Sequence, residues 1–528
     1  MRLDFVGLRL VLSIVTTNAL QNQQSDQNSA RDSNITSIAS SQAVNGSGQF
    51  IGNIACLEPL EPKTQYCPDA SMMHQDGGNT GSTDYAGPIG RNISMSTFST
   101  RIAPFLFDPH GGLTAGQPGA SGYSLKAIDP ETLEAISSWS PPTNQTLNLA
   151  YIQQIAAGSD SIILATSTQG RVFVVQRNNS ISPPTFTTSR DIDVSHALQS
   201  GEQLINGMYD TLSNIWFTTG VILGNGGMPE NTTTVGYITP SNEISTLHLQ
   251  NQAVENGIAV SNTTVYIVTG PPGDTKNSTG NMYAFQAADA GVETLWSAPY
   301  DAGSKKQPGG FARGSGTTPT LLGDAYIAVT DHADTQITLL IYHQTAQDSE
   351  DAQLLCKVPL FAPGASAVDV GSLGHASEHG YSVVLFNDYN APPIYPSANA
   401  TAADINGAFN NMTTMAAGGV RVDIPLTGSD CKITWEKDIR TKSVPLLSTK
   451  MGLLYGYEQD ADDAENGEWV WYVTARNWET GDLVWKVQTG AGGTFNDDFQ
   501  GNAIGRDGTL YQGVVGGIVV LKDGDGAT

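Results

Sequence analysis

The chain has 528 residues, of which 14% are charged and 57 are glycine, and its formal net charge at pH 7 is −26. This composition suits many short strands joined by tight turns, and all-β folds can use such a length as one domain. The acidic surface repels phosphate backbones and anionic lipids, which argues against nucleic-acid and membrane partners.

The N-terminus has the pattern of a secretory signal. Arg2 and Arg9 precede a short apolar run that ends at Thr17-Asn18-Ala19. This predicts a signal peptide over residues 1–19, although Asp4 and Arg9 are unusual in one and a buried N-terminal segment is the alternative. The run is too short to span a bilayer. Residues 20–94 are expected to form a flexible, glycosylated leader and a disulfide-containing segment, followed by one folded domain over 95–528.

Sequons and cysteines also indicate the secretory route, and hence a secreted or luminal protein. The four cysteines form an even set without a CxxC pair, which favours two disulfides over a metal site; we expect Cys56–Cys67 and Cys356–Cys431. Ten sequons are spread along the chain and predict N-glycosylation: Asn34, Asn45, Asn92, Asn144, Asn178, Asn231, Asn262, Asn277, Asn399 and Asn411.

A repeat organises the chain from residue 95 onward. Strand–turn–strand units end at Trp139, Trp296, Trp435 and Trp485, the last two 50 residues apart. Further strands, such as "SIILATS" and "TVYIVTG", are rich in β-branched and aromatic residues. A period of this size is typical of β-propeller blades. With degenerate blade ends added, the sequence predicts one all-β propeller of four-stranded antiparallel blades. Seven blades are expected, and eight if the interval 296–435 hides another; the C-terminal strands complete the ring against the N-terminal region.

The strand–"ETG"–strand–Trp pattern, clearest over residues 479–485, resembles that of the quinoprotein alcohol-dehydrogenase-like propellers over roughly residues 95–525. The same architecture with a secretory signature is similar to the fungal hetero-Diels–Alderases of tropolone-sesquiterpenoid pathways. Both resemblances imply a propeller, but this scaffold hosts many unrelated activities.

A small-molecule site is expected where loops converge on the propeller axis. Alignment of the segments ahead of each second strand places six polar residues at similar points: Gln154, Asn206, Asn256, Arg313, His375 and Gln500. Glycine follows most of them and lets the backbones crowd the axis. The amides can instead satisfy backbone groups in the channel. Arg313 favours an anionic or carbonyl partner.

Loops between second and third strands add candidates on the same face. Asp331 and His332 lie in "VTDHADTQ", where His332 is expected to titrate near neutrality unless it is a solvated loop histidine. The loop 387–418 carries Tyr389, Tyr395 and Phe409 and is either a lid or a disordered insertion. Upstream, "MMHQDGGNTGSTDYAG" either crosses the ring or connects the leader to the first blade. The acidic stretch 458–468 lacks the spacing of an EF-hand loop, so no metal site is predicted.

Three functions remain open. The preferred one is a cofactor-free cyclase, expected to be a monomer, that performs Diels–Alder-type cycloaddition on a small hydrophobic substrate. Arg313, His375 or His332 would donate to a carbonyl, and Tyr389 and Phe409 would cover the substrate. The second is a quinoprotein dehydrogenase; that resemblance implies a disulfide between adjacent cysteines and clustered calcium ligands, and no two cysteines are adjacent here. The third is a non-catalytic propeller that binds a glycan or a protein.

Overall fold

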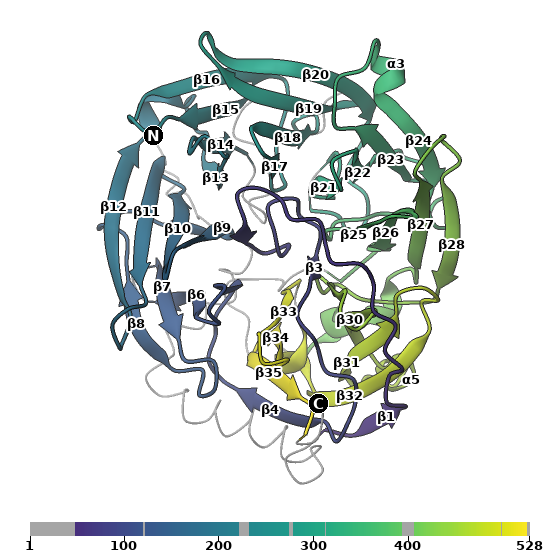
Figure 1. Cartoon of the computed structure of the whole chain (residues 1–528). Coiled ribbons are helices and arrows are strands. Elements are labelled where there is room, and N and C mark those ends of the chain that lie inside the picture. Colours follow the sequence, from purple (N-terminus) through teal and green to yellow (C-terminus); the bar gives the residue numbers. More distant parts are fainter. Residues whose placement is uncertain are drawn as a thin grey trace, which may run out of the picture.

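The computed structural model describes residues 48–119, 122–220, 232–273, 278–311, 313–392, 406–497 and 499–524. Within these ranges eight sheets follow one another around a central axis, and Figure 1 shows the resulting ring. The protein is thus a single all-β propeller with four-stranded antiparallel blades, as predicted. The predicted signal peptide and most of the leader lie outside the described residues.

Blades one to four follow each other directly in sequence, each from its inner to its outer strand. Blade one has β5 (Phe105–Phe107), β6 (Leu113–Gly119), β7 (Gly122–Ile128) and β8 (Ala135–Trp139). Blade two has β9 (Leu147–Ala157), β10 (Asp160–Ser167), β11 (Arg171–Asn178) and β12 (Thr185–Asp193). Blade three has β13 (Leu204–Tyr209), β14 (Ile215–Thr219), β15 (Thr232–Ile238) and β16 (Ile244–Gln250). Blade four has β17 (Ala259–Ser261), β18 (Thr264–Thr269), β19 (Thr279–Ala288) and β20 (Gly291–Asp301).

Blades five to seven repeat this order. Blade five has β21 (Thr320–Leu322), β22 (Tyr326–Thr330), β23 (Thr338–His343) and β24 (Leu354–Pro359). Blade six has β25 (Leu373–Ser377), β26 (Gly380–Phe386), β27 (Gly419–Pro425) and β28 (Lys432–Lys437). Blade seven has β29 (Leu446–Ser448), β30 (Leu453–Gln459), β31 (Val470–Asn477) and β32 (Leu483–Ala491). The short helices are η1 (Ser195–Ala197), α3 (Glu350–Gln353), η2 (Ala408–Asn410), η3 (Met412–Thr414), α5 (Ala461–Glu465) and η4 (Gly493–Phe495).

Blade eight joins the two ends of the chain. It consists of β33 (Asn502–Ile504), β34 (Leu510–Val514), β35 (Gly517–Lys522) and the early strand β4 (Ser94–Phe98), which pairs antiparallel with β35. The count is therefore eight, the alternative to the expected seven. The uncounted blade is not hidden in the interval 296–435. It is the C-terminal set of strands, which becomes a full blade only when β4 is added.

Outer-strand tryptophans fasten blades four and six to the blades that follow them. Trp296 donates its indole N–H to the carbonyl of Gln344 at 2.9 Å, and Trp435 donates to that of Trp478 at 3.0 Å. In both cases the acceptor belongs to the following blade. The repeated tryptophan in the sequence thus reflects contacts between blades, which bury apolar surface that one sheet alone would expose.

One of the two expected disulfides is present. Cys356 of β24 is bonded to Cys431, which directly precedes β28, so the bond joins the outer strands of blades five and six. Cys56 and Cys67 are free and exposed, so the expected pair between them is wrong. The reason is that the chain around them is anchored to different blades: Leu60 N–H donates to Thr449 of blade seven, whereas the Cys67 carbonyl accepts from Asn262 of blade four.

The segment before β4 crosses the axis of the ring, as Figure 1 shows in dark purple. β1 (Phe50–Gly52) lies on the outer edge of blade seven, β2 (Ala70–Ser71) pairs with β9, and β3 (Ser82–Thr83) pairs in parallel with β29. Between β2 and β3, carbonyls of this segment accept backbone N–H groups from four inner strands or the residues beside them, in Val260, Leu321, Gly374 and Leu447. We call residues 66–85 the plug.

Candidate functional site

The channel around the axis has two ends, defined by the direction of the inner strands. At the plug end, each inner strand is followed by a turn that leads into the second strand of its blade. In this turn of blade five, the carbonyl of Gly323 accepts a hydrogen bond from the Tyr66 hydroxyl. At the opposite end, which we call the mouth, the chain enters each inner strand from the preceding blade. The loops of the mouth bring together charged and aromatic side chains from several blades.

Two carboxyl groups interact at the mouth. Glu255 precedes β17 and is 9% exposed, and the half-buried Asp369 precedes β25. Burial, together with the charge of Asp369, raises the pKa of Glu255 well above its usual value. Burial also raises the pKa of Asp369 to about 7, against opposing effects of the Phe311 N–H and the charge of Lys306. The pair therefore holds protons near neutral pH, as paired carboxyls do.

A third carboxyl fixes the loop that carries Asp369. Asp388 follows β26 and is fully buried; its Oδ2 accepts the backbone N–H groups of Asp369 at 2.9 Å and Val370 at 3.2 Å. Its Oδ1 is buried without a hydrogen-bond partner among the described residues. Burial raises the pKa of Asp388 well above the usual range of a carboxyl. We refer to Glu255, Asp369 and Asp388 as the carboxyl cluster.

An aromatic pair lies beside this cluster. Phe311 N–H donates to Asp369 Oδ2 at 3.1 Å, and the Phe311 ring meets the Phe499 ring edge to face, with centroids 4.6 Å apart. Both rings are partly exposed. Phe499 has a φ of 64°, a strained conformation for a bulky residue of the kind that often occurs at functional sites. The Lys442 ammonium lies over the same ring, 5.0 Å from its centroid.

The predicted amides at the mouth mainly bind neighbouring backbone. Asn206 Nδ2 donates to the Asn256 carbonyl at 3.0 Å, and Asn256 Nδ2 donates to the Ser315 carbonyl at 2.7 Å. These bonds tie the inner regions of blades three, four and five together. They match the alternative that amides in the channel satisfy backbone groups. Gln500 is half-buried and directly follows Phe499.

Arg313 and His332 are neighbours at the mouth. The Arg313 guanidinium donates to the carbonyls of Gly303 and Gly273, so backbone groups supply its carbonyl partners. Burial, with the nearby Arg313 charge, lowers the pKa of His332 to about 4, and its Nε2 accepts from Gln307 N–H. The expectation that His332 titrates near neutrality is therefore wrong, because desolvation disfavours the charged imidazolium.

Two predicted residues lie towards the plug end instead. His375 Nε2 bonds to the Glu61 carbonyl at 2.9 Å. Gln154, late in β9, faces Ser71 of the plug across the β2–β9 pair. The structure therefore does not bring these two residues to the same end as Arg313.

The remaining predicted residues lie in the loops after second strands. Asp331 Oδ1 accepts from Thr338 N–H at 2.7 Å, and burial raises its pKa to about 6. Tyr389 and Phe409 are half-buried. Tyr395 and much of the proposed lid lie outside the described residues, so the lid stays a prediction.

Five of the ten predicted glycosylation sites lie within the described residues, and these fall into two groups. Asn92, Asn144 and Asn262 are exposed, whereas Asn178 and Asn411 are half-buried and accept hydrogen bonds from the Ser or Thr of their own sequons. The other five lie outside the described residues: Asn34, Asn45, Asn231, Asn277 and Asn399. Glycosylation itself stays a prediction.

Sequence reasoning found the right loops but not the residues of the carboxyl cluster. Glu255 directly precedes the predicted Asn256, and Phe499 directly precedes the predicted Gln500. Asp369 lies in "AVDVGSLGHASEHG", six residues before the predicted His375. The presence of charged residues in these loops could have indicated the carboxyl cluster, because a charge near a crowded axis must be paired or neutralised.

Two further structural features concern metals and membranes. No group of three or more His, Cys, Asp or Glu side chains in the described ranges is placed to hold a metal ion. None of the helices within those ranges is long and apolar enough to cross a membrane.

No family model matches the chain. A stretch of 319 residues is 22% identical to an uncharacterized protein of Archaeoglobus fulgidus; the match covers 55% of this chain and 57% of that protein's length.

Similar solved structures include several propellers. A quinohemoprotein alcohol dehydrogenase from Pseudomonas putida matches 87% of this chain and 81% of its own, with 11% identity and a TM-score of 0.47. The Dos1 propeller matches 81% and 93% with 7% identity and a TM-score of 0.41, and a streptogramin B lyase matches 82% and 98% with 10% identity and a TM-score of 0.34. These likenesses assign no activity to this chain.

Proposed function

We propose that the mouth is the active site of a cofactor-free cyclase that acts on a small, uncharged, largely hydrophobic substrate bearing a carbonyl group. One observation carries the proposal: Asp369, whose pKa is raised to about 7, accepts a hydrogen bond from the backbone N–H of Phe311, whose partly exposed ring packs on that of Phe499. A neutral acid next to apolar surface is suited to an uncharged substrate.

The hydrogen bonds around Asp369 indicate which oxygen acts. Oδ2 accepts from Phe311 N–H, so the proton of the neutral carboxyl belongs on Oδ1. A Cβ at Gly316 would collide with Oδ1, so glycine at this position leaves the oxygen room. From Oδ1 the acid donates a hydrogen bond to the substrate carbonyl oxygen, where electron density grows in the transition state.

Cycloaddition fits this arrangement because it requires orientation rather than a nucleophile. Two bonds form between the partners, nothing leaves, and no proton is transferred overall. The aromatic pair would hold the apolar part of the substrate, and Asp388 would keep the Asp369 loop in place through its two backbone bonds. Asp369 thus takes the donor role first expected of Arg313, His375 or His332.

The test is product formation by the purified protein with conjugated dienes and quinone-methide precursors, against a boiled control. Asp369→Leu removes the donor and should lower turnover by about 10²–10³-fold, the usual effect of losing one such donor. Asp324→Asn, at an exposed carboxylate in the turn between β21 and β22, is the matched control and should leave turnover unchanged. Equal turnover in Asp369→Leu and the wild type would remove Asp369 from the mechanism.

A further inference from the structure

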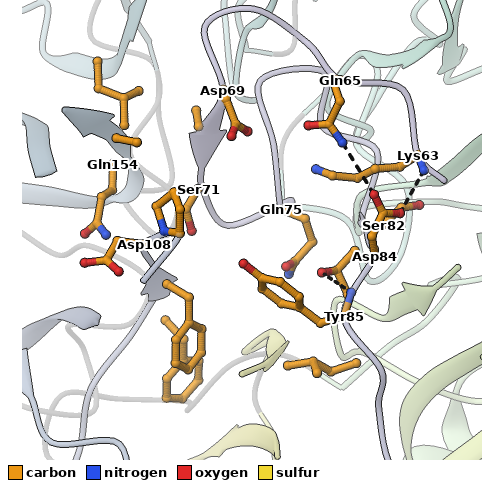
Figure 2. Close-up of a pocket in the computed structure, with 18 residues that line it drawn as sticks. Lys63, Gln65, Asp69, Ser71, Gln75, Ser82, Asp84, Tyr85, Asp108 and Gln154 are labelled. Atoms are coloured by element: carbon orange, nitrogen blue, oxygen red, sulfur yellow. Dashed lines mark hydrogen bonds between the residues drawn. The ribbon is translucent and has the colours of Figure 1, made fainter. Parts of the chain in front are cut away.

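A cavity of about 190 Å³ lies at the plug end, away from the mouth. It is enclosed by the plug on one side and by blades one, two and eight on the other, and Figure 2 shows its lining. The volume is far above the roughly 10–15 Å³ that one water molecule needs. The cavity therefore has room for a small organic molecule.

Gln154 supplies an unsatisfied polar group to this cavity. The side chain is 2% exposed, and neither its Oε1 nor its Nε2 has a hydrogen-bond partner among the described residues. The β2–β9 pair places it opposite Ser71, and Figure 2 shows its amide directed to the same part of the cavity as Asp108. Burying an unpaired amide costs about 1–3 kcal/mol, so a ligand that pairs with it would offset this cost.

Two of the three carboxylates of the lining, Asp84 and Asp108, are already engaged by the protein, and the third, Asp69, is exposed. Asp108 accepts four hydrogen bonds, from the backbone of His110 and Gly112 and from the side chains of Ser161 and Asn179. Asp84 accepts from Lys63 N–H, from Thr449 Oγ1 and, at 3.5 Å, from Gln65 Nε2. Since Asp84 and Asp108 are paired with donors, the buried group of the lining left for recognition is the neutral amide of Gln154.

The rest of the lining is both aromatic and hydroxylated. Phe105 and Phe107 form part of the wall and pack on Tyr511, with ring centroids 6.2 and 5.5 Å from it. Figure 2 shows the Tyr85 ring extending into the middle of the cavity. An amide that donates and accepts side by side matches two adjacent hydroxyl groups, and aromatic walls match the C–H faces of a sugar ring.

We propose that this cavity is a binding site for a neutral monosaccharide, with Gln154 pairing to two neighbouring hydroxyl groups and Phe105 and Phe107 contacting the ring. The net charge of −26 disfavours anionic sugars. The site is distinct from the proposed cyclase site because none of its lining residues belongs to the carboxyl cluster or to the aromatic pair.

The experiment is isothermal titration of the intact protein with glucose, galactose, mannose and N-acetylglucosamine, with glucuronate and glucosamine as charged comparators. At least one neutral sugar should bind and the charged ones should bind at least tenfold more weakly. Gln154→Met keeps the side-chain volume and should weaken binding at least tenfold, with a melting temperature equal to or above that of the wild type without sugar. Gln176→Met, at an exposed glutamine on β11 of the same blade, should bind as the wild type does.

Several outcomes overturn the proposal. These are the absence of binding by any neutral sugar, a preference for glucosamine or glucuronate, or unchanged binding by Gln154→Met. If Gln154→Met does not fold, Ser71→Ala takes its place, since it retains the backbone pairing of β2 and should weaken binding of the same sugar. Unchanged binding by that variant would equally contradict the assignment.

Discussion

Buried carboxyl groups are stabilised in different ways at the two ends of the channel. At the plug end, Asp76 accepts hydrogen bonds from Lys63 Nζ, the Thr80 hydroxyl and the backbone N–H groups of Gly78 and Thr80. At the mouth, Glu255 and Asp369 interact electrostatically, and burial raises the pKa of both carboxyls, so that protons neutralise them instead. The plug end is thus organised for stability, with Gln154 as an exception, whereas the mouth carries groups that are costly to bury and chemically useful.

The largest expected effect is at the plug end. Asp76→Ala leaves the buried ammonium of Lys63 without its partner and should lower the free energy of unfolding by about 3–5 kcal/mol. Urea denaturation at pH 7 measures it. Asp69→Ala, at an exposed carboxylate of the same segment, is the control and should cost less than about 0.5 kcal/mol. Similar losses in both variants would mean that the plug does not depend on this ion pair.

The second prediction concerns turnover at the mouth. Because the donor must be protonated, turnover should be constant below the Asp369 pKa of about 7 and should fall roughly tenfold per pH unit above it. A pH profile of kcat/KM, which reports the groups of the free enzyme, tests this. Turnover that rises through pH 7 would indicate a general base and would contradict the donor role.

The third prediction follows from the same group through protein stability. An unfolded Asp has released its proton above its ordinary pKa of 3.8, whereas folded Asp369 keeps it up to about pH 7. Wild-type stability therefore falls as pH rises between these values and is not lowered further by this group above them. Asp369→Asn should be stabilising by on the order of 2 kcal/mol at pH 8 and neutral at pH 3. Denaturation at both pH values measures the difference, and equal effects at both would be inconsistent with a raised pKa.

The smallest predicted effect is that of an amide with a structural role, whose loss should lower stability but not turnover. Asn256→Ala removes the hydrogen bond to the Ser315 carbonyl and should cost about 1 kcal/mol of stability while leaving turnover within twofold. Thermal unfolding and the cyclase assay provide the two readouts. A large loss of turnover with intact stability would return Asn256 to the list of substrate-binding residues.

The fold could be predicted because blade contacts leave a periodic trace in the sequence. The tryptophans at 296 and 435 recur since each donates its indole N–H to the following blade. Blade eight was not counted because β4 lies more than 400 residues before its partner strand β35. For the plug, the sequence left two interpretations open: a segment that crosses the ring, or a connection from the leader to the first blade. The structure of this segment depends on backbone hydrogen bonds to inner strands and not on an apolar pattern, so the sequence could not decide between them.

The candidate site was only partly predictable. Alignment of the loops identified the mouth, but neighbouring positions in a loop point in different directions, so Asn256 was chosen where Glu255 belongs to the carboxyl cluster. His375 and Gln154 lie farther along their inner strands, which places them towards the plug end. Raised carboxyl pKa values arise from burial among distant segments, and no single stretch of sequence reveals them.

The central claim is that Asp369 is a neutral acid at the mouth near neutral pH. Infrared difference spectroscopy between the wild type and Asp369→Asn tests it directly, by following the carbonyl stretching band of a protonated carboxyl group as pH is raised. This band should be present at pH 5 and should disappear with a midpoint of about 7. A carboxyl that is already ionised at pH 5 would contradict it.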